Sequence, residues 1–596
     1  MLTMQFNSNT EIQRYKPPRL RLAVCILLSH LCLATSCLFS IAYADLDIKG
    51  VDGQLLDNVL AHLQISQEPC DAPTWRLQQR RRDIHSQIKS ALQAYGYYNP
   101  DIQRQFTTTE KCWQLDIAIE KGERVLFRDI NVELKNNLGN IHPSLQNLIT
   151  APPIKSKEPL RHQAYDNYKT SIIDTARAWG YWQANFEKAE LAVFPKDLVA
   201  DVFLILNLGP RYHFGDYTFA ETPLNKDLIV RLAKNVYGKP YSSEEIQESY
   251  SRLQSSDYFS QVLIQPVVDQ SGENLGIPLS VDLSMNSKHS FGAGLGFSTD
   301  QGPRIRGDYR NRYFNAAGHK TRLDALWSVK LRQIAGTYTI PREDASEEWY
   351  ELSGGYTEEE TTSYERITLT TSVRAISALK HDWVMNTGLN ILNERYIIGS
   401  DPIDQKFLIV PGLGFSWSST DDTVRQTRGL RFETGFTTSN QAWQSDLNYI
   451  QAYTRTKAIW APTHKARFIT RLELAGTYMD DFTELPPSVR YFTGGDNSIR
   501  GYEYNSVGEI NEQGEVIGGG KLAVASVEYD YLFLPNWSAS TFFDSGDAFD
   551  GEADFKSAWG VGIRWYSPVG ALRFDIALPQ HSEEKYRLHI SVGADL

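Results

Sequence analysis

A period of two runs through residues 290–596 and restricts the fold more than any other feature of the chain. Apolar side chains alternate there with glycine or polar side chains. Near the start the apolar positions are Phe291, Ala293, Leu295 and Phe297, and near the end they are Leu588, Ile590 and Val592. Because successive side chains of a strand point to opposite faces, this pattern predicts β-strands. At about 19 residues per strand and connection, the segment holds roughly 14 to 18 antiparallel strands, with about 16 as the central value.

The two faces of these strands differ in chemistry. One face is apolar and rich in aromatic residues, whereas the other carries arginine, aspartate, glutamate and glycine. A soluble β domain, which would point its polar face outward, is one interpretation. An export signal at the N-terminus and hydrophobic strands at both ends of the segment favour the inverse arrangement, an all-β transmembrane barrel with a polar lumen.

Residues 1–44 have the order of a signal peptide. Basic residues precede an apolar stretch from Leu22 to Ile41, and Ala42-Tyr43-Ala44 then gives the small-x-small pattern of a cleavage site. We therefore expect export across an inner membrane. The alternatives are an uncleaved anchor helix and a lipoprotein cleavage site at Cys37.

Only Cys70 and Cys112, of the five cysteines, remain after such a cleavage. In an oxidising compartment two cysteines suggest one disulfide, which would close a loop of about 40 residues and contribute at most about 4 kcal/mol. Two separate buried thiols are the alternative.

One phrase occurs three times between Asp45 and Ser287, each time after an amphipathic helical pattern and before a strand-like run. The copies are Ala94-Tyr95-Gly96-Tyr97-Tyr98, Ala178-Trp179-Gly180-Tyr181-Trp182 and Ser255-Ser256-Asp257-Tyr258-Phe259. The central position favours a left-handed backbone, which suits glycine best and aspartate less well. Each unit is predicted to contain a strand, two helices and two strands. The expected domains are residues 45–122, 123–209 and 210–287, followed by the barrel at 288–596.

Such α+β units are too small to enclose a substrate cavity. Each leaves a sheet edge and a helix groove exposed, which suits strand addition by unfolded chains or docking of a partner. Inert spacers that hold another domain away from the membrane are the alternative.

A stretch of about thirty residues, from Tyr491 to Gly520, lacks strand periodicity and is rich in glycine and tyrosine. Loops of this kind are normally functional. The stretch contains Ile499-Arg500-Gly501-Tyr502, and a later strand contains Phe542-Phe543-Asp544-Ser545-Gly546.

These motifs resemble a pair found in the superfamily of outer-membrane assembly factors and two-partner secretion pores. There, Val-Arg-Gly-Phe/Tyr marks the sixth extracellular loop and Phe-x-Asp-x-Gly marks a late barrel strand. The three repeats resemble the POTRA domains of the same superfamily, so the resemblance covers essentially the whole mature chain.

The resemblance implies that the loop folds back into the lumen and that Arg500 pairs with Asp544. A guanidinium confined in a lumen needs a carboxylate that can accept its hydrogen bonds. Asp496 and Asp547 lie nearby in the sequence and remain alternative partners. The other motif residues are Ile499, Gly501, Tyr502, Phe542 and Gly546.

The number of repeats selects a branch of the superfamily. BamA has five POTRA domains and the secretion pores have two, so three repeats before a barrel resemble the TamA family. This implies a factor that helps insert β-barrel proteins, autotransporters above all. The implied partners are an inner-membrane-anchored TamB-like protein bound by the repeats, unfolded outer-membrane protein clients and outer-membrane lipid.

The expected mechanism is opening of the seam between the first and last barrel strands. The first strand carries Phe291, Leu295 and Phe297, and its glycines weaken side-chain packing. The last strand carries Leu588, Ile590 and Val592. An open seam would offer unpaired strand edges to a client.

Composition and motifs exclude several other functions. The net charge of −12 has the wrong sign for a protein that binds nucleic-acid phosphates, and no apolar run of 18 or more residues follows residue 44. The chain lacks a Gly-x-Ser-x-Gly elbow, a phosphate loop and paired histidine spacing, so we expect no enzymatic activity, no cofactor and no metal. A secretion pore for a soluble client and a passive channel are the remaining competitors.

Overall fold

A computed structural model describes residues 45–108, 112–135, 141–420, 425–567, 570–580, 582 and 584–593. The predicted signal peptide lies outside these residues, and so do Ala594, Asp595 and Leu596 at the end of the predicted last strand. The contacts divide the chain into two compact units. Of the described residues, one unit contains those within 45–177 and 183–209, and the other contains those within 178–182 and 210–593.

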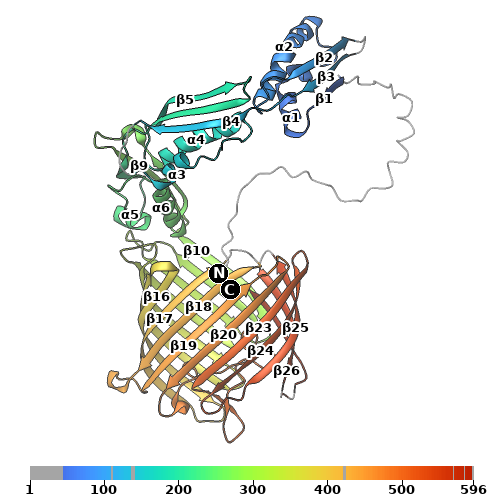
Figure 1. Ribbon diagram of the computed structural model, residues 1–596. Coiled ribbons are helices and arrows are strands. Elements are labelled where there is room, and N and C mark those ends of the chain that lie inside the picture. Colours follow the sequence, from blue (N-terminus) through green and yellow to red (C-terminus); the bar gives the residue numbers. More distant parts are fainter. Residues whose placement is uncertain are drawn as a thin grey trace, which may run out of the picture. The chain divides into compact units, whose positions relative to one another are not determined.

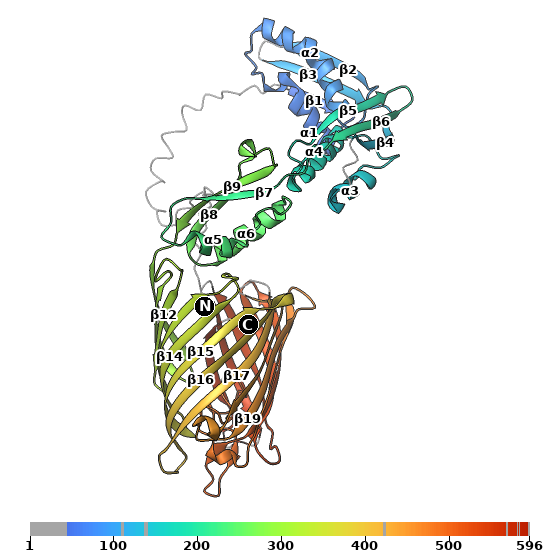
Figure 2. The same ribbon diagram turned by 90° about the vertical axis from the view of Figure 1, so that its left-hand side faces the viewer.

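Three small α+β repeats share one order of elements (Figures 1 and 2). The first has β1 (Asp45–Lys49), α1 (Gly53–His62), α2 (Thr74–Gln93), β2 (Asp101–Thr108) and β3 (Trp113–Glu120). The second has β4 (Leu126–Leu134), α3 (Pro143–Thr150), α4 (His162–Ala178), β5 (Asn185–Phe194) and β6 (Val199–Asn207). The third has β7 (His213–Phe219), α5 (Lys226–Ala233), α6 (Ser243–Ser255), β8 (Phe259–Pro266) and β9 (Gly276–Met285). The predicted order of a strand, two helices and two strands is confirmed.

Within each repeat the last strand occupies the centre of a three-stranded sheet. It runs parallel to the first strand and antiparallel to the second. In the first repeat, alternate residues of β3 meet one face of α1 and α2, which buries Val59, Ile84, Ile88, Leu115 and Ile117. A disulfide joins Cys70 to Cys112 beside this core, and Cys112 lies just before β3.

The repeated phrase adopts the expected backbone in all three copies. The φ angles are +88° at Gly96, +89° at Gly180 and +65° at Asp257. The left-handed central residue stops each helix and directs the following aromatic residues back toward the sheet.

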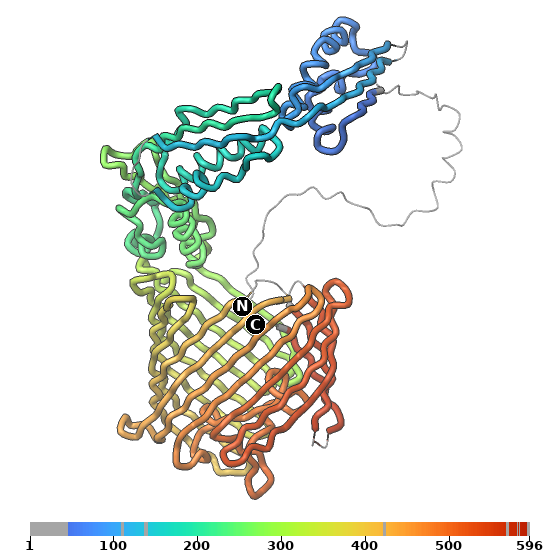
Figure 3. Tube along the Cα trace, in the orientation of Figure 1, coloured from blue at the N-terminus to red at the C-terminus, as the bar shows by residue number. Residues whose placement is uncertain are grey.

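A single antiparallel sheet of 16 strands forms the barrel. Neighbouring strands lie side by side with a common tilt (Figure 3). The strands are β10 (His289–Ser298), β11 (Gly302–Asn311), β12 (Lys320–Ser328), β13 (Leu331–Pro341), β14 (Trp349–Glu360), β15 (Tyr364–Ala378), β16 (Trp383–Ile398), β17 (Asp404–Thr420), β18 (Arg428–Ser439), β19 (Tyr449–Trp460), β20 (Ala466–Tyr478), β23 (Lys521–Leu534), β24 (Trp537–Phe549), β25 (Lys556–Ser567), β26 (Gly570–Pro579) and β27 (Arg587–Gly593). None of the described helices is long and apolar enough to cross a membrane.

The apolar face of the barrel strands points outward, as predicted. On β25 the side chains of Trp559, Val561 and Ile563 are about half exposed, whereas that of Arg564 is buried in the interior. An exposed apolar belt around a buried polar interior is the inverse of a soluble fold and suits a lipid environment.

The stretch between β20 and β23 is a long loop with one difference from the prediction. It contains a short hairpin, β21 (Glu509–Ile510) and β22 (Val516–Gly518), where no strand was expected. Hydrogen-bonded bridges of Tyr491 with Gly519 and of Thr493 with Val507 close the loop upon itself. The loop is therefore a folded element, although its strands are too short to show a period of two.

Candidate functional site

Strand alternation decides which side chains of the barrel wall meet the loop. On β23, Val527 is half exposed on the outer surface while Glu528 is buried, and on β24, Phe543 is half exposed while Asp544 is buried. Asp575 on β26 is buried in the same way. These carboxylates face inward from three strands, and a cation in the loop lies among them.

Arg500 is that cation. Its Nε atom donates to Asp544 Oδ2 at 2.7 Å and its Nη2 atom donates to Asp544 Oδ1 at 3.0 Å, which is a two-pronged contact. Its Nη1 atom donates to Glu528 at 2.7 Å and to Asp575 at 3.2 Å. The guanidinium carbon also lies 3.4 Å from the centre of the Phe542 ring.

A second arginine offsets a further part of the negative charge of the cluster. Arg564 on β25 donates to Glu528 at 2.9 Å and to Asp575 Oδ2 at 3.1 Å. Ser526 donates to Asp544 at 2.6 Å. Charges removed from water are stable only when they are paired and hydrogen-bonded, and this cluster meets that condition.

Glycine at 501 lets the loop approach the wall. Its φ is +102°, and a Cβ there would lie 3.1 Å from Ala558 Cβ and 3.3 Å from Pro579 Cβ. Gly546 has a similar role on β24, because a Cβ there would lie 2.8 Å from the carbonyl oxygen of Ala523. The close approach buries Ile499 completely, and the hydroxyl of Tyr502 donates to the carbonyl of Gln580.

The other two acidic candidates lie apart from Arg500. Asp547 accepts a hydrogen bond from the backbone N–H of Asp554 at 2.7 Å. Asp496 lies instead at the seam, where its Oδ1 accepts from Thr299 at 2.9 Å and contacts His589 on β27.

Asp496, Asp300 and His589 form a second cluster, with polar atoms within 4.8 Å of one another; His589 is buried and the two aspartates are partly buried. Asp300 belongs to the turn between β10 and β11 and accepts from the backbone N–H of Asp496 at 2.8 Å. The cluster therefore ties together the first hairpin, the loop and the last strand.

Two carboxylates and an imidazole are ligand types that suit a divalent cation, but the imidazole is arranged for a different task. Its Nε2 atom accepts the backbone N–H of Gly501 at 2.9 Å, so its proton resides on Nδ1. That proton points at Asp496 Oδ1. The Nδ1 atom is thus a donor to the loop and has no free lone pair for a metal.

The seam lies between the two edges of the sheet, β10 and β27, which are not paired with each other over their described residues. Two hydrogen bonds of Thr299, the residue after β10, link this end of the first strand to β27: its N–H donates to Ile590 O at 3.3 Å, and its Oγ1 accepts from Ile590 N at 3.2 Å. On β10, Phe291 and Leu295 are 79% and 86% exposed, and Phe297 is also exposed. On β27, Leu588 and Val592 are exposed.

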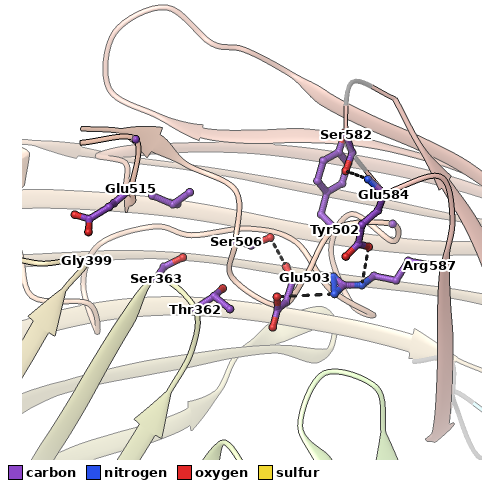
Figure 4. Close-up of a pocket in the computed structure, with 13 residues that line it drawn as sticks. Thr362, Ser363, Gly399, Tyr502, Glu503, Ser506, Glu515, Ser582, Glu584 and Arg587 are labelled. Carbon is purple, nitrogen blue, oxygen red and sulfur yellow. Dashed lines mark hydrogen bonds and ion pairs between the residues drawn. The ribbon is translucent and has the colours of Figure 1, made fainter. Parts of the chain in front are cut away.

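A cavity of about 590 Å³ lies where the loop meets β27 (Figure 4). Glu503 points from the loop toward Arg587, with an N–O distance of 3.8 Å, and Arg587 also lies 3.5 Å from Glu584. Ser363 and Gly399, from turns between earlier strands, form the opposite wall. The cavity is polar and open, and it shows that the loop leaves space beside the last strand.

Sequence reasoning did not identify Glu528, Asp575, Arg564, Asp300 or His589 as site residues. Three of them, Arg564, Asp575 and His589, fall on the polar face of a predicted strand, which was the available signal. Many other polar residues share that phase, and only the register between strands selects those that meet Arg500 or Asp496.

Family comparison matches the barrel and the first repeat. A model of the Omp85 superfamily domain matches residues 271–595, and a model described as POTRA domain TamA domain 1 matches residues 45–121.

Two curated relatives are outer membrane protein assembly factors named BamA. The protein from Nitratidesulfovibrio vulgaris (strain Hildenborough) is 24% identical over 375 residues, which cover 59% of this chain and 46% of the relative. The protein from Neisseria meningitidis serogroup B is 22% identical, with 85% of this chain and 72% of the relative covered. The chain thus spans less than half the length of the first relative.

Among solved structures, BamA from Haemophilus ducreyi lacking POTRA domains 1-3 has the same fold as most of this chain. The TM-score is 0.67 at 17% identity, with 79% of this chain and 99% of that structure covered. The barrel lies in the outer membrane of a Gram-negative bacterium and the repeats lie in the periplasm. Since the superfamily domain covers more than half of its residues, this chain belongs to the Omp85 superfamily.

Proposed function

We propose that this protein inserts β-barrel proteins, autotransporters above all, into the outer membrane by opening the seam between β10 and β27. The seam is the observation that carries the proposal. Over the described residues, every other neighbouring pair in the sheet has a ladder, interrupted by a single irregularity between β23 and β24, whereas the bonds across the seam are those of Thr299, the residue after β10, with Ile590 on β27. At about 1 kcal/mol net for each hydrogen bond, separating these two bonds costs little.

An open seam gives a client what it lacks in the membrane. A strand that enters lipid must satisfy all of its backbone N–H and C=O groups, and an exposed sheet edge provides half of them. β10 has a full ladder with β11 on its other side, so it keeps its conformation while its free edge pairs with a client.

The partners follow from the same proposal. Unfolded outer-membrane proteins are the clients, and an inner-membrane-anchored TamB-like protein binds the repeats. The match of residues 45–121 to a POTRA domain of the TamA type supports this branch. We expect the first repeat to contribute the binding surface, so a chain without residues 45–122 should no longer copurify with such a partner.

The test is a photo-crosslinking residue at Leu295 in cells that are producing autotransporters. We expect it to capture strands of a client barrel during assembly. The same residue at Leu413, which faces outward from the paired strand β17, is the matched control and should capture none. Capture of only β27 from Leu295, together with a soluble exported chain crosslinked in the lumen, would instead establish a secretion pore.

A further inference from the structure

In each copy of the repeated phrase, a cation from the following domain contacts the residues on both sides of the left-handed residue. In the first copy, the carbonyl of Tyr95, just before the left-handed residue, accepts from Arg124 Nε at 2.7 Å. The guanidinium of Arg124 lies 5.6 Å from the centre of the Tyr97 ring, just after that residue. One cation thus contacts both sides of Gly96.

The second copy repeats this geometry. The carbonyl of Trp179 accepts from Arg211 Nε at 3.0 Å, and the guanidinium lies 5.9 Å from the centre of the Tyr181 ring. Arg124 and Arg211 each stand two residues before the first strand of the next repeat, β4 or β7. The arginine is therefore part of the start of a repeat and docks on the phrase that precedes it.

The third copy is followed by the barrel, and the barrel supplies a lysine in the same place. The carbonyl of Ser256 accepts from Lys320 Nζ at 2.6 Å. The ammonium lies 4.2 Å from the centre of the Tyr258 ring, which is 1% exposed. Lys320 is the first residue of β12, so two strands of the barrel come before it in the sequence.

A second contact of the phrase is reproduced as well. The carbonyl of the left-handed residue accepts a backbone N–H in the first two copies, from Val125 to Gly96 at 2.9 Å and from Tyr212 to Gly180 at 2.9 Å. In the third copy the side-chain amide of Asn286 donates to the carbonyl of Asp257 at 3.0 Å.

Other contacts complete the junction between the third repeat and the barrel. The hydroxyl of Tyr258 donates to the carbonyl of Gly318, and Asp257 pairs with Arg312 at 3.1 Å. Arg252 on α6 donates to Glu347 at 3.0 Å, in the turn between β13 and β14.

We propose that Lys320 is the docking residue of the barrel, and that it holds the third repeat by occupying the site that an arginine fills at the start of each later repeat. A lysine suffices because the contact requires one donor to a carbonyl and one positive charge over a ring. In this contact, Arg124 and Arg211 donate to a backbone carbonyl and do not use two N–H groups on a carboxylate.

Docking of this kind assigns the third repeat to one side of the seam. Lys320 and Arg312 flank the turn between β11 and β12, and β11 is hydrogen-bonded along β10. If the seam opens, which rests on the proposed function, the third repeat moves with β10 and away from β27.

The test is a distance measurement on the full chain in lipid nanodiscs. Spin labels at Gln247→Cys on α6 and Lys380→Cys in the turn between β15 and β16 report the position of the repeat on the barrel. We expect one narrow distance distribution for the otherwise unaltered chain and for Lys320→Arg. Lys320→Met, which keeps the length of the side chain without its charge, should broaden the distribution at least twofold.

Two further variants serve as a control and as a substitute for Lys320→Met. Lys406→Met removes a lysine near the start of a different barrel strand, β17, and should leave the distribution narrow. Lys320→Gln keeps a hydrogen-bond donor without the charge, and it should broaden the distribution too; it replaces Lys320→Met if that variant does not fold. A folded Lys320→Met or Lys320→Gln protein with the narrow distribution overturns the proposal.

The assembly of clients in cells is scored separately. A broadened distribution with normal assembly keeps the docking role and argues against coupling to the seam. A narrow distribution with impaired assembly overturns the docking role, because Lys320 then affects assembly without holding the third repeat.

Discussion

Arg500 contacts three carboxylates on three different strands, so it fixes the loop to a whole sector of the wall. Asp544 alone supplies two of its side-chain contacts and also accepts its backbone N–H at 3.1 Å. Loss of Asp544 would leave a buried guanidinium with incomplete compensation, because Glu528 is shared with Arg564.

We expect Asp544→Asn to lower the free energy of unfolding by about 3 kcal/mol, the low end for breaking a buried ion pair, since two carboxylates remain. Urea unfolding of the barrel in lipid vesicles measures this. Asp547→Asn is the matched control and should change the value by no more than about 1 kcal/mol. Equal effects of the two substitutions would show that Arg500 does not depend on Asp544.

The cluster of Asp300, Asp496 and His589 at the seam contains a carboxylate oxygen without a hydrogen-bond donor among the described residues. The side chain of Asp496 is 5% exposed, and among the described residues its Oδ2 atom has no hydrogen-bond partner, while the carboxylate of Asp300 lies beside it. Two neighbouring carboxylates repel each other unless they share a proton.

Asp300→Asn is therefore expected to stabilise the closed seam by about 1 kcal/mol, because an amide removes the repulsion and can donate to Asp496. His589→Phe should weaken the seam, because it removes the donor to Asp496 and the acceptor for Gly501. Hydrogen exchange at β27 measures both effects. Faster exchange in Asp300→Asn would show that the carboxylate pair holds the seam closed.

Among the elements, β10 shows how one strand combines weak packing with a required geometry. A Cβ at Gly292 would lie 2.3 Å from a carboxylate oxygen of Asp308, whereas a Cβ at Gly294 would meet no atom within 4 Å. These two glycines therefore serve different purposes, although they occupy the same face of the same strand.

The same substitution should thus have opposite results at the two positions. Gly294→Val should stabilise β10 by up to about 1 kcal/mol, the span of strand propensities, and slow the capture of clients. Gly292→Val should displace Asp308 and loosen the pairing of β10 with β11. Hydrogen exchange along β10 distinguishes them, and similar exchange in both variants would contradict the assignment.

Sequence predicted these elements because their periods are local. The alternation in β10 and β27 and the helix stop at Gly96 depend on neighbours along the chain. Arg500 could be matched to Asp544 only because both stand in recognisable motifs. Lys320 had no such signal, since its contact with Ser256 depends on how the barrel turn meets the third repeat.

Register explains the remaining gap. Asp575 reaches Arg500 because β26 pairs with β25 so that Asp575 lies opposite Gly562, next to Arg564. A shift of one residue would point Asp575 toward lipid. No pattern within β26 alone fixes that register, so the charge cluster emerges only from the assembled sheet.

At the scale of the whole molecule, the sheet is an almost closed ring in which one junction differs from fifteen others. The loop supports that junction from inside through two of its residues: Arg500, which contacts Asp544 on β24, and Asp496, which contacts His589 on β27. Opening must therefore release the contacts of Asp496 and Thr299 while those of Arg500 keep the loop on the wall.

A disulfide across the seam should separate opening from folding. Thr299→Cys with Ile590→Cys places two thiols at the hydrogen-bonded contact of the seam. Oxidation should leave the barrel folded, as judged by its heat-modifiable mobility on gels, and reduce client insertion at least tenfold, with recovery on reduction. The matched control is Leu413→Cys with Phe436→Cys, a pair directly opposite each other on β17 and β18, where a crosslink joins strands that remain paired in any case. Normal insertion by the oxidised seam variant would mean that clients do not enter between β10 and β27, and the proposed mechanism would fall while the fold and the family stand.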